Sequence, residues 1–417
     1  MSTEPNTFVS NPALEGYNVI RETWKRFYNP EKGTFTTPRP KVSGVYGDEG
    51  KFNVWSVAVV AQSIMDGAKI YPQELGPLID PTVKALYKYR SPQYYGYCAV
   101  ENFQGNEDIY YDDDAQVAFA LIGAFEITGN KEYLDRAREL VRYLMGGWNK
   151  DSKAKNQGGV LWHRDKPYIS AISNSECALA ALRIARLIPN ESKIYIDFGA
   201  KAIEWLIKYL LDDDYLVLDG IDKNSDGANG MKWTYNTGVA LSAASHLYEY
   251  TKDDKWKHHA NELAAAATNK NKSLFDRDYG EMDRRYYRDP SYFVQLLFEG
   301  FADYLLLVGD KVPESTGNAI RTQLKRHLIY FRKYLYDSND GLYFQMFQAF
   351  QISEDIYKLY TKQFGSSKKF SPNSEERAQE GNGSLESKPL VKTLIGSGSA
   401  ARIWFQAARV LPELQDD

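Results

Sequence analysis

The chain has 417 residues, of which 43% are hydrophobic and 25% charged, enough apolar material to bury the core of a folded protein. Its 51 Lys and Arg residues nearly balance its 55 Asp and Glu residues, so no basic excess points to nucleic acid or to an anionic membrane as a partner. Only Cys98 and Cys177 are present, which is too few for a disulfide framework.

The N-terminal residues 1–7 have neither the basic start nor the apolar segment of a signal peptide. No run of about 18 apolar residues occurs, so we expect no membrane-spanning helix. As written, the sequence predicts a cytoplasmic protein, or an extracellular one if a leader preceded residue 1. We also expect a monomer.

Two kinds of helix alternate along the chain. One kind has a single apolar face, and its segments are 13–28, 79–90, 131–145, 195–211, 253–267 and 313–335. The other kind is apolar on most of its surface, and its segments are 54–70, the helix that begins at Asp112, 175–187, 235–250, 291–308 and 394–410. A helix with one apolar face belongs on the outside of a fold, whereas a helix that is apolar all round is buried.

This alternation predicts an all-α fold, an (α/α)6 barrel in which six helical hairpins form an inner and an outer ring. No linker interrupts the first 360 residues, so we expect a single catalytic domain over residues 1–417. The tract 365–388 is rich in Ser, Glu, Lys and Gly and has almost no apolar residues. Such a composition predicts a mobile insertion before the last inner helix.

In such a ring, the loops that lead into the inner helices open at the same end, so their residues should meet in one cleft. The candidate site residues are Asn53, Trp55, Tyr110, Tyr111, Asp112, Asp113, Trp162, His163, Asn174, Trp233, Tyr235 and Asn236. Many of them are aromatic, and flat rings pack well on the C–H faces of sugars. For Asn174, a role as a helix cap is the simpler interpretation.

Three acids, Asp112, Asp113 and Asp114, stand in the first turn of the second apolar helix. Free N–H groups and the helix dipole favour acids there, which is a purely structural explanation for the run. The chemical explanation is glycosidic bond cleavage. It needs one carboxyl group to protonate the leaving oxygen and another to attack carbon or deprotonate water. Side chains of adjacent helical residues diverge, so Asp112 and Asp113 can supply that pair.

Several motifs together resemble glycoside hydrolase family 76, the endo-α-1,6-mannanases, over roughly residues 50 to 310. They are Tyr-Asp-Asp-Asp-Ala at 111–115, Gly-Gly-Val-Leu-Trp at 158–162, Ser-Asn at 173–174, Leu-Asp-Gly at 218–220 and Trp-Thr-Tyr-Asn-Thr-Gly at 233–238. The resemblance implies an (α/α)6 barrel and a retaining double displacement on α-1,6-linked mannan. Asp112 resembles the nucleophile and Asp113 the general acid/base. Asp114 and Gln116 stand where the family usually shows Asn and Trp.

Other functions are compatible with parts of the pattern. A transglycosidase acting on mannose-containing glycans of the cell wall would use the same chemistry, and a non-catalytic carbohydrate-binding protein would use the acids only as hydrogen-bond partners. A sugar isomerase would need converging His bases, and the five His residues do not supply them. Residues 222–227 imitate a calcium loop, but Trp233 stands where a bidentate Glu is required. We therefore expect neither a metal nor an organic cofactor, and a carbohydrate as the only partner.

Overall fold

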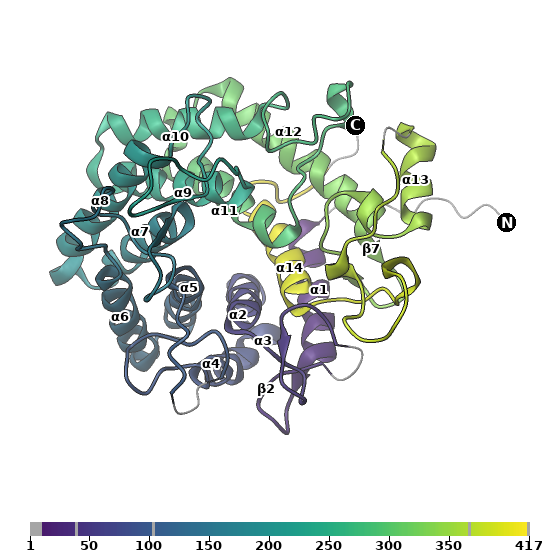
Figure 1. The fold of residues 1–417 in the computed structure, drawn as a ribbon, viewed down its shortest axis with the longest axis horizontal. Coiled ribbons are helices and arrows are strands. Elements are labelled where there is room, and N and C mark those ends of the chain that lie inside the picture. Colours follow the sequence, from purple (N-terminus) through teal and green to yellow (C-terminus); the bar gives the residue numbers. More distant parts are fainter. Residues whose placement is uncertain (1–10, 38–40, 102–104, 366–367, 415–417) are drawn as a thin grey trace.

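Helices from both halves of the chain form two concentric rings in the computed structural model, which describes residues 11–37, 41–101, 105–365 and 368–414 (Figure 1). The inner ring consists of α2 (Val54–Ala68), α5 (Tyr111–Thr128), α7 (Ala171–Ala185), α9 (Thr234–Thr251), α11 (Ser291–Leu307) and α14 (Leu394–Ala408). The outer ring consists of α1 (Pro12–Phe27), α4 (Ile79–Tyr87), α6 (Lys131–Gly146), α8 (Ser192–Leu210), α10 (Asp254–Thr268) and α12 (Glu314–Tyr330).

The inner ring closes on itself. Each inner helix packs against the next in the order α2, α5, α7, α9, α11 and α14, and α14 packs back on α2. The outer helix α1 lies against α14, so the N-terminal part of the described chain completes the last hairpin. The predicted (α/α)6 barrel is confirmed, and the alternation of amphipathic and apolar helices is its cause, because only the inner helices are covered on all sides.

Smaller elements occupy the connections. Two short helices were not predicted, α3 (Pro72–Leu75) and α13 (Glu354–Phe364), and α12 continues as a π-helical turn at Phe331–Leu335. Single 3₁₀ turns lie at Gly76–Leu78, Pro189–Glu191, Met282–Arg284, Gly309–Lys311, Ala349–Gln351, Ser374–Glu376 and Leu385–Ser387. The strands form two-stranded antiparallel ladders: β1 (Tyr28–Asn29) with β2 (Thr34–Phe35), β3 (Val45–Tyr46) with β4 (Lys51–Phe52), β5 (Tyr168–Ser170) with β6 (Gly220–Asp222), and β7 (Tyr336–Asp337) with β8 (Leu342–Tyr343).

Helices α9 and α11 approach each other at two glycines. A Cβ atom on Gly300 would lie 2.2 Å from the carbonyl oxygen of Gly238, and a Cβ atom on Gly238 would lie 2.5 Å from the Cα of Leu297. Both obstacles are backbone atoms, which cannot rotate away as a side chain can. Glycine at these positions is therefore what allows the two inner helices to touch.

The axis of the barrel contains charged groups as well as hydrocarbon. The guanidinium of Arg402 on α14 is 1% exposed and lies 2.9 Å from both Asp66 on α2 and Glu299 on α11. Burying a charge is costly unless it is paired and hydrogen-bonded, and Arg402 meets that condition through partners on two other helices.

The tract 365–388 is anchored at its centre, which its composition did not predict. Glu376 is 1% exposed, and its Oε1 accepts hydrogen bonds from the backbone N–H groups of Gln345 and Met346 at 2.8 and 2.7 Å. The neighbouring Glu375 accepts a hydrogen bond of 3.0 Å from the hydroxyl of Tyr292 on α11. Carboxylate groups thus help to attach the tract to the barrel, together with the buried Ala378. Residues 366 and 367 lie outside the described part of the chain.

In the described part of the chain, no helix has both the length and the apolar character needed to cross a bilayer.

Candidate active site

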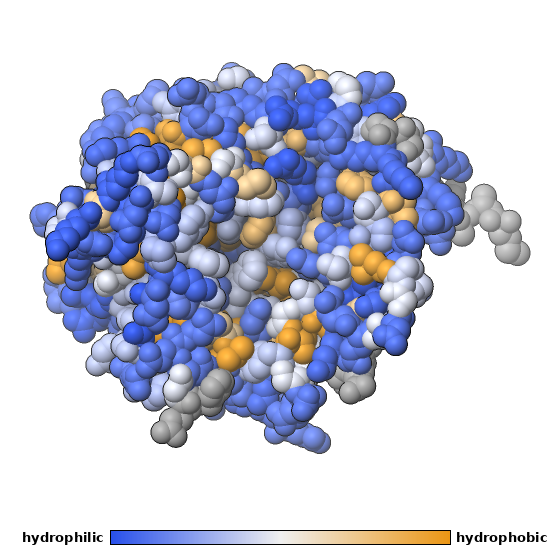
Figure 2. Space-filling model, viewed as in Figure 1, coloured by the Kyte–Doolittle hydropathy of each residue, from blue (hydrophilic) through white to orange (hydrophobic). Residues whose placement is uncertain are grey.

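A cleft of ≈ 610 Å³ opens where the inner helices begin. It is lined by Asn53, Trp55, Ala99, Asp108, Tyr110, Asp112, Asp113, Gln116, Trp162, Tyr168, Ser170, Ile172, Glu176, Asp219, Asn229, Tyr235, Phe293 and Leu296. The face of the molecule in Figure 2 is hollowed near its centre, over the helical ring, and the residues in the hollow are paler than the blue rim. Loops from distant parts of the sequence thus meet at one end of the barrel, as predicted from the order of the helices.

Asp112 is held in place by the first turn of α5 and by the loop that precedes α7. Its Oδ1 accepts the backbone N–H of Asp113 at 3.0 Å, which provides the cap that the side chain of Tyr110 does not. Its Oδ2 accepts the indole N–H of Trp162 at 3.1 Å. The loop is aligned because the backbone N–H of Tyr111 donates to the carbonyl of Trp162 at 2.9 Å. Both oxygens of Asp112 are therefore oriented by donors.

The two neighbouring carboxyl groups have different environments. Burial raises the pKa of Asp112 to about 6, while its hydrogen bonds from Asp113 and Trp162 lower that pKa. Burial, followed by the nearby charge of Asp112, raises the pKa of Asp113 well above its usual range. The pair therefore shares its protons unequally, with the charge favoured on Asp112 and the proton on Asp113.

Asp114 stabilises the fold and is not part of the cleft. It is fully buried, and its Oδ2 accepts the backbone N–H of Tyr97 at 3.0 Å, which fastens the preceding loop to α5. The side chain does not line the cleft. Only two of the three acids in this run therefore face the site.

The cleft is strongly acidic. Five of the described residues that line it are carboxylic acids, namely Asp108, Asp112, Asp113, Glu176 and Asp219, and none of them is basic. A cleft with this charge repels anionic ligands and suits neutral ones. Its aromatic walls, with Tyr235 stacked on Phe293 at 4.0 Å and Trp55 against Tyr292 at 5.4 Å, suit the apolar faces of sugar rings.

Seven of the predicted site residues lie in the cleft: Asn53, Trp55, Tyr110, Asp112, Asp113, Trp162 and Tyr235. Asn53 also caps α2, since its Oδ1 accepts the backbone N–H of Ser56 at 3.0 Å. Tyr110 packs edge-on against Trp162 at 4.9 Å. These residues share a position at the start of an inner helix or on the loop just before one.

Five predicted residues do not line the cleft: Tyr111, His163, Asn174, Trp233 and Asn236. Tyr111 stacks on Tyr143 of α6, because the next residue of a helix turns by about 100° away from its neighbour. His163 is buried with its Nε2 2.9 Å from Asp108 Oδ1. The amide of Asn174 bonds the backbone of Val160 and Ser170, so it is a structural group.

The other two of these residues come from the start of α9. Trp233 is half-buried and packs against Phe293 at 5.6 Å. Asn236 is fully buried, and its amide atoms have no hydrogen-bond partner in the described part of the chain. Neither side chain is among the residues that line the cleft.

Several cleft residues were not predicted, and most of them were hidden by their surroundings in the sequence. Gln116 and Glu176 stand inside apolar runs, where an isolated polar residue was the available signal. Tyr168 begins β5 and Asp219 directly precedes β6, and the Tyr168 hydroxyl donates to Asp219 at 2.7 Å. Their pairing depends on a contact between segments about fifty residues apart.

No group of three or more His, Cys, Asp or Glu side chains within the described ranges has an arrangement suited to a metal ion.

A ring of paired helices whose cleft combines adjacent carboxyl groups with aromatic walls defines the class of protein, a barrel enzyme that acts on carbohydrates. The sequence model of glycosyl hydrolase family 76 matches residues 15–363, and the chain belongs to this family. It is therefore a glycosidase, and the resemblance predicted from the motifs is confirmed.

Proteins of Schizosaccharomyces pombe and Saccharomyces cerevisiae are related to this chain. The meiotically up-regulated gene 191 protein of Schizosaccharomyces pombe is 31% identical over 95% of this chain and 92% of its own length. The mannan endo-1,6-alpha-mannosidase DCW1 of Saccharomyces cerevisiae is 30% identical over 33% of this chain and 31% of its own length.

Solved structures show the same fold. The GH76A alpha-1,6-mannanase from Salegentibacter sp. HEL1_6 has a TM-score of 0.71 at 17% identity, covering 95% of this chain and 99% of that one. A variant of that enzyme, described as inactive, has two consecutive aspartates replaced by asparagine and was solved in complex with alpha-1,6-mannotriose. It has a TM-score of 0.67 at 17% identity, over 96% of this chain and all of that one.

Proposed function

We propose that this protein cleaves α-1,6-mannosidic bonds in mannan by a double displacement that retains the configuration at the anomeric carbon. The observation that carries the proposal is the unequal environment of Asp112 and Asp113 in a cleft with aromatic walls. A double displacement needs one carboxylate and one carboxylic acid side by side, and this arrangement favours that distribution of charge.

In the first step, the Asp112 carboxylate attacks the anomeric carbon and forms a glycosyl ester. The bond to the leaving oxygen breaks, and Asp113 donates its proton to that oxygen. In the second step, water attacks the same carbon while Asp113 takes a proton from it. The ester bond breaks, Asp112 is released as a carboxylate, and Asp113 is again protonated.

The indole N–H of Trp162 has a clear part in this scheme. Its hydrogen bond to Oδ2 of Asp112 stabilises the carboxylate that must attack and leaves Oδ1 held by the helix N-terminus. The choice of α-1,6-mannan is supported by the family and by the relatives named above.

The test is incubation with linear α-1,6-mannan oligosaccharides, with α-1,2- and α-1,3-linked mannans as controls, followed by NMR of the first product. We expect cleavage of the 1,6 linkage and an α-anomer that appears before mutarotation. A β-anomer would contradict the double displacement. Cleavage of the α-1,2 or α-1,3 linkages without cleavage of the 1,6 linkage would contradict the proposed substrate.

The same incubation with an added acceptor glycan separates hydrolysis from transfer. If longer oligosaccharides replace the hydrolysis product, the sugar hydroxyl rather than water completes the second step. The roles of Asp112 and Asp113 would be unchanged in that case.

A further inference from the structure

Glu176 is a buried acid of the cleft that the double displacement does not use. It lies on α7 between Ser175 and Cys177, is 2% exposed, and lines the cleft together with Asp112 and Gln116. The charge of Asp112 and burial together raise its pKa well above the usual range, with burial the larger cause. A glutamate in such a position is retained at a cost to folding unless a partner compensates for it.

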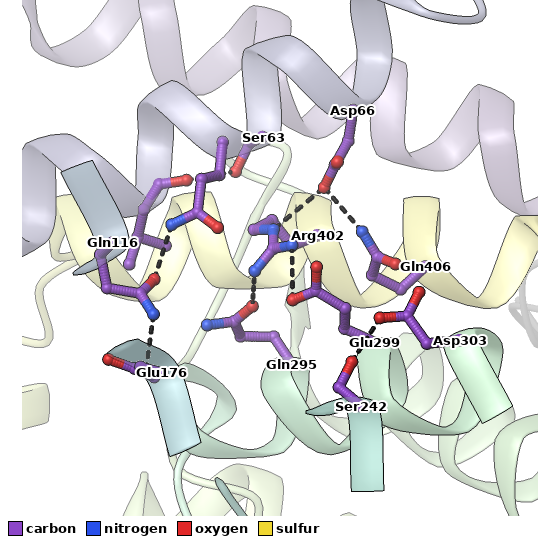
Figure 3. A network of polar contacts seen from close by, with 12 residues as sticks. Ser63, Asp66, Gln116, Glu176, Ser242, Gln295, Glu299, Asp303, Arg402 and Gln406 are labelled. Atoms are coloured by element: carbon purple, nitrogen blue, oxygen red, sulfur yellow. Dashed lines mark hydrogen bonds and ion pairs between the residues drawn. The ribbon is translucent and has the colours of Figure 1, made fainter. Parts of the chain in front are cut away.

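One oxygen of this carboxyl group is hydrogen-bonded by Gln116 (Figure 3), which is in turn hydrogen-bonded by Gln62. The amide Nε2 of Gln116 on α5 donates to Glu176 Oε1 at 2.6 Å, and the Oε1 of Gln116 accepts from Nε2 of Gln62 on α2 at 2.6 Å. Gln116 and Gln62 are 1% and 4% exposed, so both amides depend on these bonds.

The direction of this relay is set at its far end. Nε2 of Gln62 also lies 3.4 Å from the backbone carbonyl of Ala58, and a carbonyl can only accept. The amide nitrogen of Gln62 must therefore be the atom that faces Ala58 and Gln116. Because this nitrogen donates, Gln116 accepts through its oxygen and donates through its nitrogen. Glu176 Oε1 is consequently an acceptor, and the proton of the acid belongs on Oε2.

Glu176 Oε2 has no hydrogen-bond partner in the described part of the chain, although it is buried at the cleft. A buried O–H group without an acceptor is rare in folded proteins, and most such groups are satisfied by water or by a ligand. The nearby Asp112 and Tyr235, both of which interact electrostatically with Glu176, also line the cleft.

We propose that Glu176 is a substrate-recognition residue, whose Oε2 hydroxyl donates a hydrogen bond to a hydroxyl oxygen of the sugar unit bound beside Asp112. The glutamine relay from α2 and α5 holds the acid in the orientation that presents this donor. The inference rests on the proposed function, because it requires a glycan in the cleft.

A binding experiment tests the proposal in the Asp112→Asn/Asp113→Asn background, which is expected to bind without turnover. Affinity for α-1,6-mannotriose is measured by calorimetry for this parent and after adding Glu176→Gln or Glu176→Met. Gln keeps an acceptor for Gln116 and a donor toward the cleft, whereas Met has a similar length and no donor. We expect affinity within about 3-fold of the parent for Gln and a loss of about 10- to 100-fold for Met.

A set of trisaccharides that each lack one hydroxyl of the reacting sugar makes the test specific. The parent should lose affinity for one of them, and the Glu176→Met variant should bind that one and the full trisaccharide equally well. Ser175→Ala is the matched control, since it removes a hydrogen bond to Ala171 within α7 without touching the cleft. It should leave affinity unchanged even if the melting temperature falls.

The outcomes separate the two proposals. Equal affinity of the parent and the Glu176→Met variant would overturn the role of Glu176 alone. A parent that binds no α-1,6-mannotriose would overturn the proposed substrate, and the role of Glu176 with it. If the Met variant does not fold, Glu176→Leu takes its place in the same measurements.

In the active enzyme, the same substitutions should separate binding from chemistry. A recognition residue for a bound sugar changes KM more than kcat, and Glu176→Gln should restore KM. A residue that only supports the fold would lower stability without changing KM, and that result would also contradict the proposal.

Discussion

The indole N–H of Trp162 donates a hydrogen bond of 3.1 Å to Oδ2 of Asp112. This bond connects the loop before α7 to the first turn of α5, and it lowers the pKa of a carboxyl group that burial raises to about 6. A bond to the charged form of an acid stabilises that form, so Trp162 helps to keep Asp112 ionised.

Replacing Trp162 by Phe should move the acidic limb of the pH profile of kcat/KM to higher pH. Without the indole donor the pKa of Asp112 rises further, and the nucleophile is ionised only at higher pH. Near pH 6 we expect kcat/KM to fall by about 10-fold. Trp205→Phe is the matched control, because that indole donates to the backbone of Gln157 at 2.9 Å outside the cleft. An unchanged acidic limb in Trp162→Phe would count against Asp112 as the nucleophile.

Asn at position 112 or 113 should abolish or strongly reduce cleavage while the fold persists. We expect no detectable product from Asp112→Asn and a loss of about 10²- to 10⁴-fold from Asp113→Asn, measured as new reducing ends. The control is Asp114→Asn, in which the amide oxygen still accepts the N–H of Tyr97. Its activity should stay within a few-fold of that of the native protein. If Asp112→Asn and Asp113→Asn both retain activity, the assignment of these two residues as catalytic is wrong.

The stability of the protein should depend on pH through Asp112. Its pKa is raised from the model-compound value of 3.8 to about 6 in the folded state, so the folded state binds this proton more tightly than the unfolded state does. The stabilisation that results is fully present below pH 3.8 and is lost as the pH rises through about 6.

Asp112→Asn has no such titration. The melting temperature of the variant minus that of the native protein should therefore increase from pH 4 to pH 7. Thermal denaturation followed by circular dichroism at several pH values measures this difference. A difference that is constant across the range would contradict a raised pKa of Asp112 in the folded protein.

Alanine at Gly300 should destabilise the barrel without altering the cleft directly. Its Cβ would lie 2.2 Å from a backbone oxygen of α9, so the two inner helices must separate. We expect the free energy of unfolding to fall by about 1–3 kcal/mol, measured by denaturant titration. Gly146→Ala at the end of α6 is the control, because a Cβ there meets nothing within 4 Å. It should be neutral or stabilising by up to about 1 kcal/mol.

Helical periodicity alone located the twelve ring helices, usually within a few residues of their ends. This was possible because a helix buried on one side has a single apolar face, whereas a helix buried on all sides is apolar throughout. The anchored centre of the tract around Glu376 has no such pattern, since its carboxylate is held by backbone N–H groups of a distant segment. The short helix α13 was not predicted, and its Tyr360 packs against Tyr279 and Tyr330 of distant segments.

The sequence likewise predicted one part of the candidate site, and the structure was needed for the rest. Position along the chain was sufficient to place Asp112, Asp113 and Trp162 at the mouth of one cleft, because every inner helix begins at the same end of the ring. Only the tertiary structure decided that Tyr111 and Asp114 face away from the cleft, and that Glu176 meets Gln116, which in turn meets Gln62, across three helices. The reason is physical: hydrophobic periodicity records how deeply a side chain is buried, whereas the neighbour it meets depends on how the helices are rotated against one another.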